Sequence, residues 1–416
     1  MFEFGRDLRR LFEKARDSDD LGWLELIGVG LVEVEARQQS IEAGRVSCAR
    51  PHDAALRASA LWREHARRSG AGLSLDKAEA AARDAVRHAR NDDETIRATL
   101  ELAQSGMLAF DLCGDPARLD AVLALLAALP AARRGDTAAA VAALHARLRA
   151  RQASLSGEAA TLQDAAVMLD NALHGLKGQQ RPIEDDLRLD RAALMLEAGL
   201  AARDPRMLDQ AGGDLRALVE AATPEQRPLS RARALALCAT GMAALAAIAD
   251  DVLARDQAHG LFDAAADQFT PDHSPLDWAA IQVLRAERET LPLLVLVQAE
   301  ALTEGGGLVL GALAHERRVA QEASRAGSIG DLSALLEIET GLRRRLSRPS
   351  VVSTPLDWAS DQIGMARIAL ARARWTGQTP RGLGLMLTEA AATAREYGAP
   401  ALAQRAERLA RAPETA

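Results

Sequence analysis

Two stretches of the chain, Pro275-Leu-Asp-Trp-Ala279 and Pro355-Leu-Asp-Trp-Ala359, have the same sequence and begin 80 residues apart. Each follows a hydroxyl-bearing residue, Ser274 or Thr354, whose oxygen can accept a hydrogen bond from a free amide at a helix start. Proline suits the first helical position, where its missing N–H has no partner to lose. Aspartate two residues later suits the positive end of the helix dipole and can complete a capping box. Both stretches therefore predict helix starts.

Similar proline-led starts occur upstream at regular intervals. The prolines Pro182, Pro228 and Pro275 lie 46 and 47 residues apart, and the 80-residue interval to Pro355 fits two units of 40. A period of about 40–47 residues with two helices per unit is typical of helical repeat proteins. The spacing therefore favours an all-α array of stacked helix pairs.

Helical patterning continues through most of the chain. Apolar residues recur every three or four positions, and short Gly, Pro and Asp clusters interrupt them. Aromatic residues make up only 3% of the chain, and Ala, Leu, Arg and Glu dominate, which disfavours large sheets. We predict roughly seventeen or eighteen helices. The clearest predicted spans are 92–112, 117–129, 136–152, 157–176, 183–202, 206–222, 230–249, 254–269, 275–304, 308–326, 331–346, 355–375, 380–397 and 400–411.

The beginning of the chain is less regular. Residues 22–30 contain three glycines, each of which disfavours a helix by about 1 kcal/mol relative to alanine. Trp23, Ile27, Leu31 and Val34 nevertheless fall on one face of a helix. We therefore predict that this segment is helical.

The N-terminus also carries Phe2, Phe4 and Phe12, half of the six phenylalanines in the chain. A repeat array needs the open side of its first unit covered. We therefore predict that residues 1–90 form an N-terminal helical capping region and that residues 91–416 form the helical repeat region. Self-association through Phe2, Phe4 and Phe12 is the second hypothesis for this apolar end.

The pattern S/T-P-L-D-W-A-x-x-Q, present at both helix starts, resembles the tetratricopeptide-like (TPR-like) repeats of bacterial proteins. The resemblance implies a right-handed α-solenoid of antiparallel helix pairs, built from degenerate units. It also implies that Pro275, Trp278, Pro355 and Trp358 pack one unit against the next.

The same resemblance implies what the protein binds. The first helix of each unit in such solenoids lines a concave groove, which takes a peptide or helix from a partner protein. Transferred to this sequence, the groove positions are Gln282, Glu287, Gln362 and Arg367. We therefore expect a non-catalytic interaction scaffold or adaptor that recruits or sequesters another protein.

The sequence contains no motif for catalysis or for metal binding. Its eight histidines are never three or four residues apart, and its three cysteines form no CxxC pair. The one glycine-rich stretch, Gly305-Gly306-Gly307, lacks the Gly-Lys-Ser/Thr sequence of a phosphate-binding loop. We therefore expect no enzyme activity, no metal and no cofactor.

Charge and hydropathy restrict the partner and the compartment. The net charge of −7 disfavours binding to nucleic acid. The N-terminus lacks the apolar core of a signal peptide, and the longest apolar stretch, 291–297, is far shorter than the roughly 20 residues that span a bilayer. We expect a cytoplasmic protein without stable membrane insertion.

Two other functions stay open at this point. One is an enzyme or a small-ligand receptor with a pocket inside a helical toroid, which requires convergent polar side chains in one cavity. The other is a homo-oligomeric structural protein that associates through its phenylalanine-rich end. The basic run Arg343-Arg344-Arg345 also has two interpretations, because arginine favours a helix C-terminus and can equally contact an acidic partner or a phosphate.

Overall fold

Helices form almost the whole of the structure. It is a computed structural model that describes residues 21–132, 134–176, 181–347, 354–378 and 380–411. Across these ranges the chain forms eighteen α-helices after one short 3-10 helix, and it forms no strand. The prediction of an all-α protein is confirmed.

Most helices from residue 92 onward begin and end within a few residues of the predicted spans. The first ten elements are η1 (Gly22–Leu26), α2 (Val29–Ala43), α3 (Pro51–Ser69), α4 (Gly72–His88), α5 (Asp92–Cys113), α6 (Ala117–Ala127), α7 (Gly135–Ser156), α8 (Ala159–Leu176), α9 (Arg181–Ala202) and α10 (Pro205–Ala221). The other nine are α11 (Pro228–Ala249), α12 (Val252–Ala266), α13 (Pro275–Arg285), α14 (Leu293–Ala301), α15 (Leu308–Ile329), α16 (Leu332–Leu346), α17 (Pro355–Thr376), α18 (Leu383–Glu396) and α19 (Pro400–Arg411).

The prediction of a single helix over 275–304 is wrong, because the chain leaves the helix between α13 and α14. Pro292 has an extended backbone and lacks an amide hydrogen, and proline also disfavours helical geometry at the residue before it. That residue, Leu291, instead donates its backbone N–H to Gln321 Oε1 at 3.2 Å. The apolar periodicity was correct on both sides, and the interruption combines the effect of Pro292 with this tertiary hydrogen bond.

The prediction for the start of the chain is also wrong in part. A 3-10 helix covers Gly22–Leu26, and α2 begins only after Gly28, whose backbone is extended. Val29 donates its N–H to Asp272 O at 3.3 Å, so this segment pairs with a distant turn instead of continuing one helix. Leu31 and Val34 are consequently exposed and do not share a buried face with Ile27.

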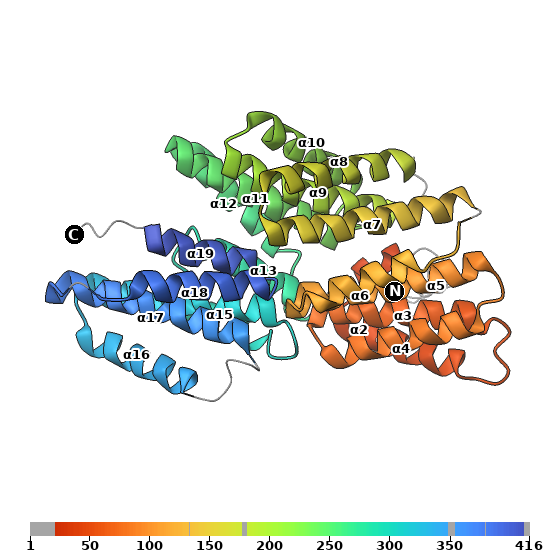
Figure 1. Ribbon diagram of the computed structural model, residues 1–416, viewed down its shortest axis with the longest axis horizontal. Helices are drawn as coiled ribbons and strands as arrows, with labels where there is room; N and C mark the ends of the chain where they lie inside the picture. Colours follow the sequence, from red (N-terminus) through yellow and green to blue (C-terminus); the bar gives the residue numbers. More distant parts are fainter. Residues whose placement is uncertain (1–20, 133, 177–180, 348–353, 379, 412–416) are drawn as a thin grey trace, which may run out of the picture.

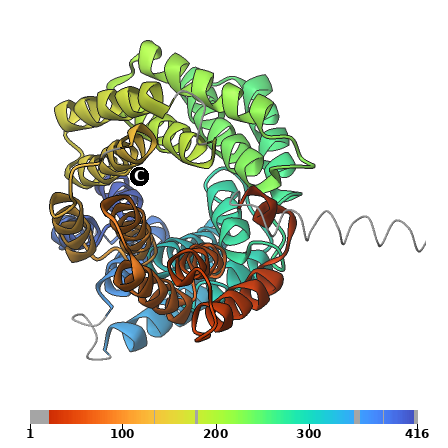
Figure 2. The same ribbon diagram turned by 90° about the vertical axis from the view of Figure 1, so that its right-hand side faces the viewer.

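The helices are arranged as a ring when the molecule is viewed along its long axis (Figure 2). Consecutive helices pack on each other all along the chain, and the odd-numbered helices from α3 to α19 also pack on the next odd-numbered helix. The even-numbered helices of the described chain do not pack comparably on one another. In a curved double layer the inner elements lie closer together than the outer ones. We therefore refer to the side formed by the odd-numbered helices as the inner face.

The chain passes around the ring and returns to its own beginning (Figures 1 and 2). η1 contacts α11, α3 contacts α13, and α5 contacts α15. Ser230 donates its backbone N–H to Glu25 Oε2 at 2.9 Å, and Gly72 donates its N–H to Gly305 O at 3.2 Å. These bonds join residues more than 200 positions apart, so the N-terminal and C-terminal halves form one body.

Two close backbone approaches accompany this contact between the halves. A Cβ atom on Gly306 would lie 2.4 Å from Gly70 O, and one on Gly398 would lie 2.7 Å from Gly114 Cα. Gly114 and Gly398 have φ values of +75° and +66°, a conformation that glycine adopts without a steric penalty. Glycine is therefore required at these turns both for their shape and for their contact.

The two PLDWA stretches begin helices as predicted. Pro275 and Pro355 are the first residues of α13 and α17. Ser274 occupies the N-cap position of α13, but its hydroxyl donates to Asp277 Oδ2 at 2.6 Å and makes no cap bond to a backbone amide. The predicted capping box is therefore replaced by a side-chain pair, because Asp277 is held by Arg233 of α11 at the same time.

Helix α11 is the one described helix that is long and apolar enough to cross a bilayer, judged only by length and composition. It packs on α9, α10, α12 and α13 within the ring. Core helices of water-soluble proteins have the same composition, so this observation is weak evidence for a membrane span.

Candidate functional site

The inner face is crossed by ion pairs between neighbouring odd-numbered helices. Their partners lie 38 to 44 residues apart in the sequence, close to the predicted repeat period. The pairs are Arg63–Glu101, Arg147–Asp186, Arg147–Asp190, Arg151–Asp111, Arg151–Asp190, Arg227–Asp185 and Arg233–Asp277. Most of the charge on this face is thus already neutralised by the protein itself.

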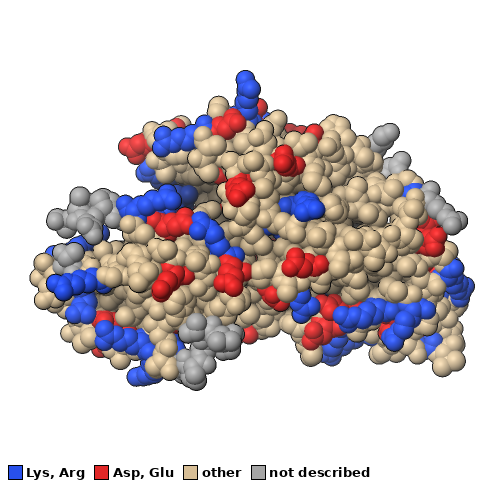
Figure 3. Space-filling model, viewed as in Figure 1, with Lys and Arg blue, Asp and Glu red and all other residues tan. Residues whose placement is uncertain are grey.

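Charges of both signs also mix on the outside of the molecule. On the side shown in Figure 3, acidic and basic side chains alternate, and neither sign forms a broad continuous patch. A strongly basic surface would be expected of a nucleic-acid-binding protein. The charge distribution on this side has no such character.

A cleft of about 300 Å³ lies on the inner face, between α5, α7, α9 and the turn that precedes α19. Arg151 bridges its acidic wall, with Nη2 2.9 Å from Asp111 Oδ2 and Nη1 3.0 Å from Asp190 Oδ2. Burial alone would raise the pKa of Asp190, but Arg151 and Arg147 outweigh burial and lower it. The carboxylates of Asp111 and Asp190 are therefore both paired with arginine.

Glu197 is the exception in this cleft. Among the described residues no Arg, Lys or His lies within ion-pair distance of its carboxylate, which accepts only from Gln404 Nε2 at 3.2 Å and from Ser154 Oγ at 3.5 Å. Burial raises the pKa of Glu197 because no cation compensates for the lost water. The cleft thus presents one unneutralised carboxylate beside the apolar side chains of Phe110, Leu155 and Leu194.

Of the four predicted groove residues, two are joined in one internal ionic chain. Glu287 pairs with Arg405 of α19, Arg405 pairs with Glu316 of α15 at 3.0 Å, and Glu316 pairs with Arg367 at 2.8 Å. Glu316 and Arg405 are buried. Glu287 and Arg367 therefore hold the C-terminal helices together, and their charges are not free for a partner.

The other two predicted groove residues lie on α13 and α17. Gln282 is buried in the core, so it is not accessible to a partner, and Gln362 is half-buried. The resemblance to TPR-like repeats had placed them at the same register of two separate repeat units. Both lie at the same position of their helices, seven residues after the proline, so their different burial comes from the helices packed around them.

The structure describes the two tryptophans that were predicted to pack the repeats. It does not describe the phenylalanines that were predicted for self-association. Trp278 is half-buried against apolar residues of α11 and α12, such as Leu229 and Phe262. Trp358 is half-buried against residues of α15 and α18, such as Ala312 and Leu387. The residues predicted for self-association, Phe2, Phe4 and Phe12, lie outside the described part of the chain.

A buried histidine that sequence reasoning missed lies between α14, α15 and α17. His315 Nδ1 is 2.8 Å from Glu300 Oε1, and its Nε2 is 2.8 Å from Asp361 Oδ1. Burial alone would lower the pKa of His315, but the two carboxylates raise it. Each partner lies on a different helix, so no local spacing in the sequence could have identified this group.

The basic run at the end of α16 is largely occupied by the protein's own acids. Arg343 pairs with Glu339 at 2.5 Å, and Arg345 Nε lies 3.0 Å from Asp361 Oδ2. Only Arg344 is exposed without a partner among the described residues. This arrangement favours the structural interpretation of the run.

We also searched the structure for metal-binding groups and compared the chain with known proteins. Within the described ranges no group of three or more His, Cys, Asp and Glu side chains is arranged to hold a metal ion. No protein-family model matches the chain, and neither a curated protein nor a solved structure matches it.

Proposed function

We propose that this protein is a non-catalytic interaction scaffold whose inner face binds a segment of a partner protein. On this proposal the fold is a right-handed α-solenoid of antiparallel, TPR-like helix pairs that has closed into a ring. The ion pairs at separations of 38 to 44 residues support this proposal, because they join equivalent positions on successive odd-numbered helices.

The observation that carries the proposal is the unpaired carboxylate of Glu197 in the inner cleft. A half-buried acid without a cation destabilises the protein that contains it, unless a ligand neutralises it. A lysine or arginine side chain of a partner supplies that charge, and Phe110, Leu155 and Leu194 contact its aliphatic stem. The proposed partner is therefore a peptide segment that contains a basic residue.

The proposal is tested by selecting ligands for the intact protein from a displayed library of random linear peptides. Selected peptides are synthesised with a fluorophore, and binding is measured by fluorescence anisotropy. We expect the peptides to share a Lys or Arg and the Glu197→Gln variant to bind them about tenfold more weakly. A charge-assisted hydrogen bond is worth about 1.5–3 kcal/mol, which supports that magnitude.

The control for this experiment is Glu220→Gln, an exposed change on α10, outside the inner face. We expect this variant to bind as the parent does. Because burial raises the pKa of Glu197, the neutral Glu197→Gln side chain should leave the thermal unfolding midpoint unchanged or higher. Peptides that lack a basic residue, or that bind Glu197→Gln as tightly as the parent, would refute the proposal.

A further inference from the structure

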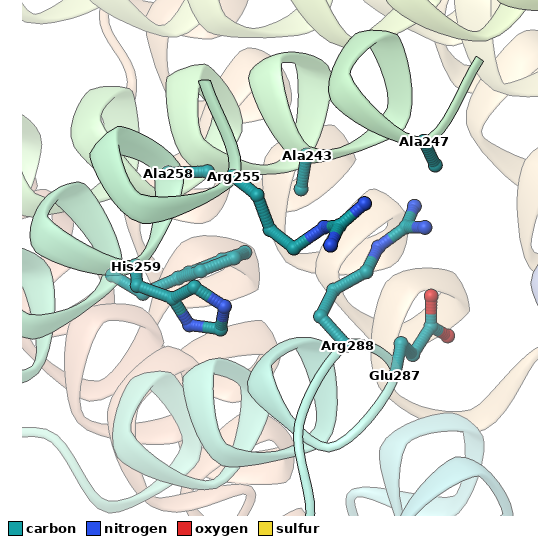
Figure 4. A pocket seen from close by; sticks show the side chains of 8 residues that line it. Ala243, Ala247, Arg255, Ala258, His259, Glu287 and Arg288 are labelled. Carbon is teal, nitrogen blue, oxygen red and sulfur yellow. The ribbon is translucent and has the colours of Figure 1, made fainter. Parts of the chain in front are cut away.

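A second cavity lies between α11, α12 and the segment that follows α13. Its volume is about 200 Å³. Figure 4 shows Arg255 of α12 and Arg288 of the segment after α13 extending into this pocket from opposite walls, with His259 beside them. Ala243, Ala258 and Phe262 form the apolar part of its lining.

Within the described part of the chain, neither guanidinium group in this pocket pairs with a buried carboxylate. Among the described residues the Arg288 side chain has no hydrogen-bond or ion-pair partner. Arg255 reaches only Asp250, at 3.3 Å, and the Asp250 side chain is 95% exposed, so water screens that contact. Two like charges that enter one pocket repel each other unless an anion lies between them.

The neighbouring acids do not supply this anion. Glu287 lines the pocket, but Arg405 holds its carboxylate. Glu289 is held by Arg285 at 2.7 Å and lies 3.5 Å from His259 Nδ1. The pocket therefore presents two guanidinium groups, and the only acidic partner of either in the described chain is the exposed Asp250.

The wall behind the pocket is also rich in arginine. Arg405 and Arg317 both approach the buried carboxylate of Glu316, which cannot fully neutralise both. Burial, together with the nearby Arg405 and Arg367, lowers the pKa of Arg317 to about 10. The positive potential of this region thus extends beyond the two side chains in the pocket.

We propose that this pocket binds the phosphate group of a small organic phosphate monoester. A phosphate monoester carries a charge of about −1.5 to −2 at pH 7, which matches two arginines. Guanidinium groups bind phosphate oxygens through paired hydrogen bonds, and Arg255 and Arg288 can each supply such a pair from one side.

The apolar lining limits the rest of the ligand. Pockets for drug-sized ligands measure roughly 300–1,000 Å³, so a volume of about 200 Å³ admits a phosphate and one small apolar group. Phe262 offers a surface against which a ring or a short hydrocarbon chain can pack. This site is distinct from the Glu197 cleft and does not depend on the proposed peptide binding.

Isothermal titration of the full chain with phenyl phosphate tests this inference, with inorganic phosphate and benzoate as comparison ligands. We expect saturable binding of phenyl phosphate at one site, weaker binding of the other two, and a loss of about tenfold or more in Arg255→Gln and Arg288→Gln. Arg288→Lys keeps the charge but loses the paired geometry, so we expect an intermediate affinity.

Arg344→Gln is the matched control, because Arg344 is exposed on α16 and has no partner among the described residues. We expect this variant to bind phenyl phosphate as the parent does. Circular dichroism establishes that each variant keeps its helices. Absence of saturable binding, an equal loss in Arg344→Gln, or benzoate or inorganic phosphate binding as tightly as phenyl phosphate would overturn the proposal.

Discussion

At the scale of single residues, buried charges are compensated by specific partners drawn from different helices. Arg68 is an example, because its side chain is fully buried and donates to Leu24 O and Ile27 O, each at 2.8 Å. The same side chain donates to Glu64 at 2.6 Å. Burial alone would raise the pKa of Glu64, but Arg67 and Arg68 hold it well below its usual range. Such groups fix η1 to α3.

The His315 group gives a prediction at this scale. Its pKa is raised in the folded protein, because Asp361 and Glu300 stabilise the imidazolium more than burial and Arg345 destabilise it. The stability it contributes is therefore fully present below its ordinary pKa of 6.5 and is lost as the pH rises through the raised value. His315→Gln should lower the free energy of unfolding by about 3 kcal/mol at pH 6 and by less at pH 9.

Urea unfolding of the parent and of His315→Gln at several pH values between these limits measures the effect. Arg318 and Arg345 also face this group, and both stay charged throughout that range. The difference between the two proteins therefore follows the titration of His315. A constant difference at all pH values would contradict the assigned role.

At the scale of helices, the repeated PLDWA start places a tryptophan against the neighbouring helices. Trp358 is half-buried at the beginning of α17, against residues of α15, α18 and α19. Trp→Ala changes in protein cores lower the free energy of unfolding by about 3–5 kcal/mol. Because Trp358 is only partly buried, its loss should fall at the lower end of this range. We expect Trp358→Ala to reduce the free energy of unfolding by about 3 kcal/mol.

Chemical denaturation measures this loss, and Leu385→Ala serves as a comparison. Leu385 lies on α18 but is 68% exposed, so its truncation should change stability by less than about 0.5 kcal/mol. A loss below about 1 kcal/mol for Trp358→Ala would mean that this tryptophan does not join the helices that it touches.

The sequence was a good guide to most helices and a poor one to their interruptions. Periodicity and proline-led starts are local signals, and they predicted α5 to α12 and α15 to α19 closely. The break between α13 and α14 depends on the bond from Leu291 to Gln321, and the break at Gly28 depends on the contact with Asp272. Pro292 and Gly28 are visible in the sequence as residues that disfavour a helix, but Gln321 and Asp272 are not close in sequence, so the contacts that accompany the two breaks could not be predicted from local patterns.

At the scale of the whole molecule, the N-terminal and C-terminal halves of the chain contact each other and hold the ring together. The turn after α5 meets the turn between α18 and α19 at Gly114 and Gly398. A Cβ atom at Gly398 would clash with Gly114 Cα at 2.7 Å and with its oxygen at 2.8 Å. This contact brings together residues that are far apart in the chain. Its loss should therefore destabilise the ring.

Gly398→Ala tests this junction, and Gly377→Ala is its control. Both glycines have a positive φ, +66° and +67°, but a Cβ atom at Gly377 would meet nothing within 4 Å. Gly377→Ala should therefore lower the free energy of unfolding only by the backbone penalty of about 1 kcal/mol. Gly398→Ala should lower it by about 3 kcal/mol, because the new Cβ atom also clashes. Equal losses in urea unfolding would show that the contact between the turns adds no stability.

The candidate site was less predictable than the fold. The repeat period favoured stacked helix pairs, but it indicated neither the ion pairs between odd-numbered helices nor which acid would stay unpaired. Among the described residues Glu197 has no ion-pair partner, and its contact with Gln404 joins residues 207 positions apart, which no local pattern reveals. Glu287 was predicted as a groove residue, and the structure instead pairs it with Arg405.

The proposed binding of a basic peptide on the inner face is tested most directly by cross-linking. A selected peptide carrying a photoreactive residue beside its lysine or arginine is bound to the full chain and irradiated, and mass spectrometry locates the attached residues. The account predicts attachment to α5, α7, α9 or the turn before α19, and loss of attachment in Glu197→Gln. Attachment on α10 or α12, unchanged in that variant, would contradict it.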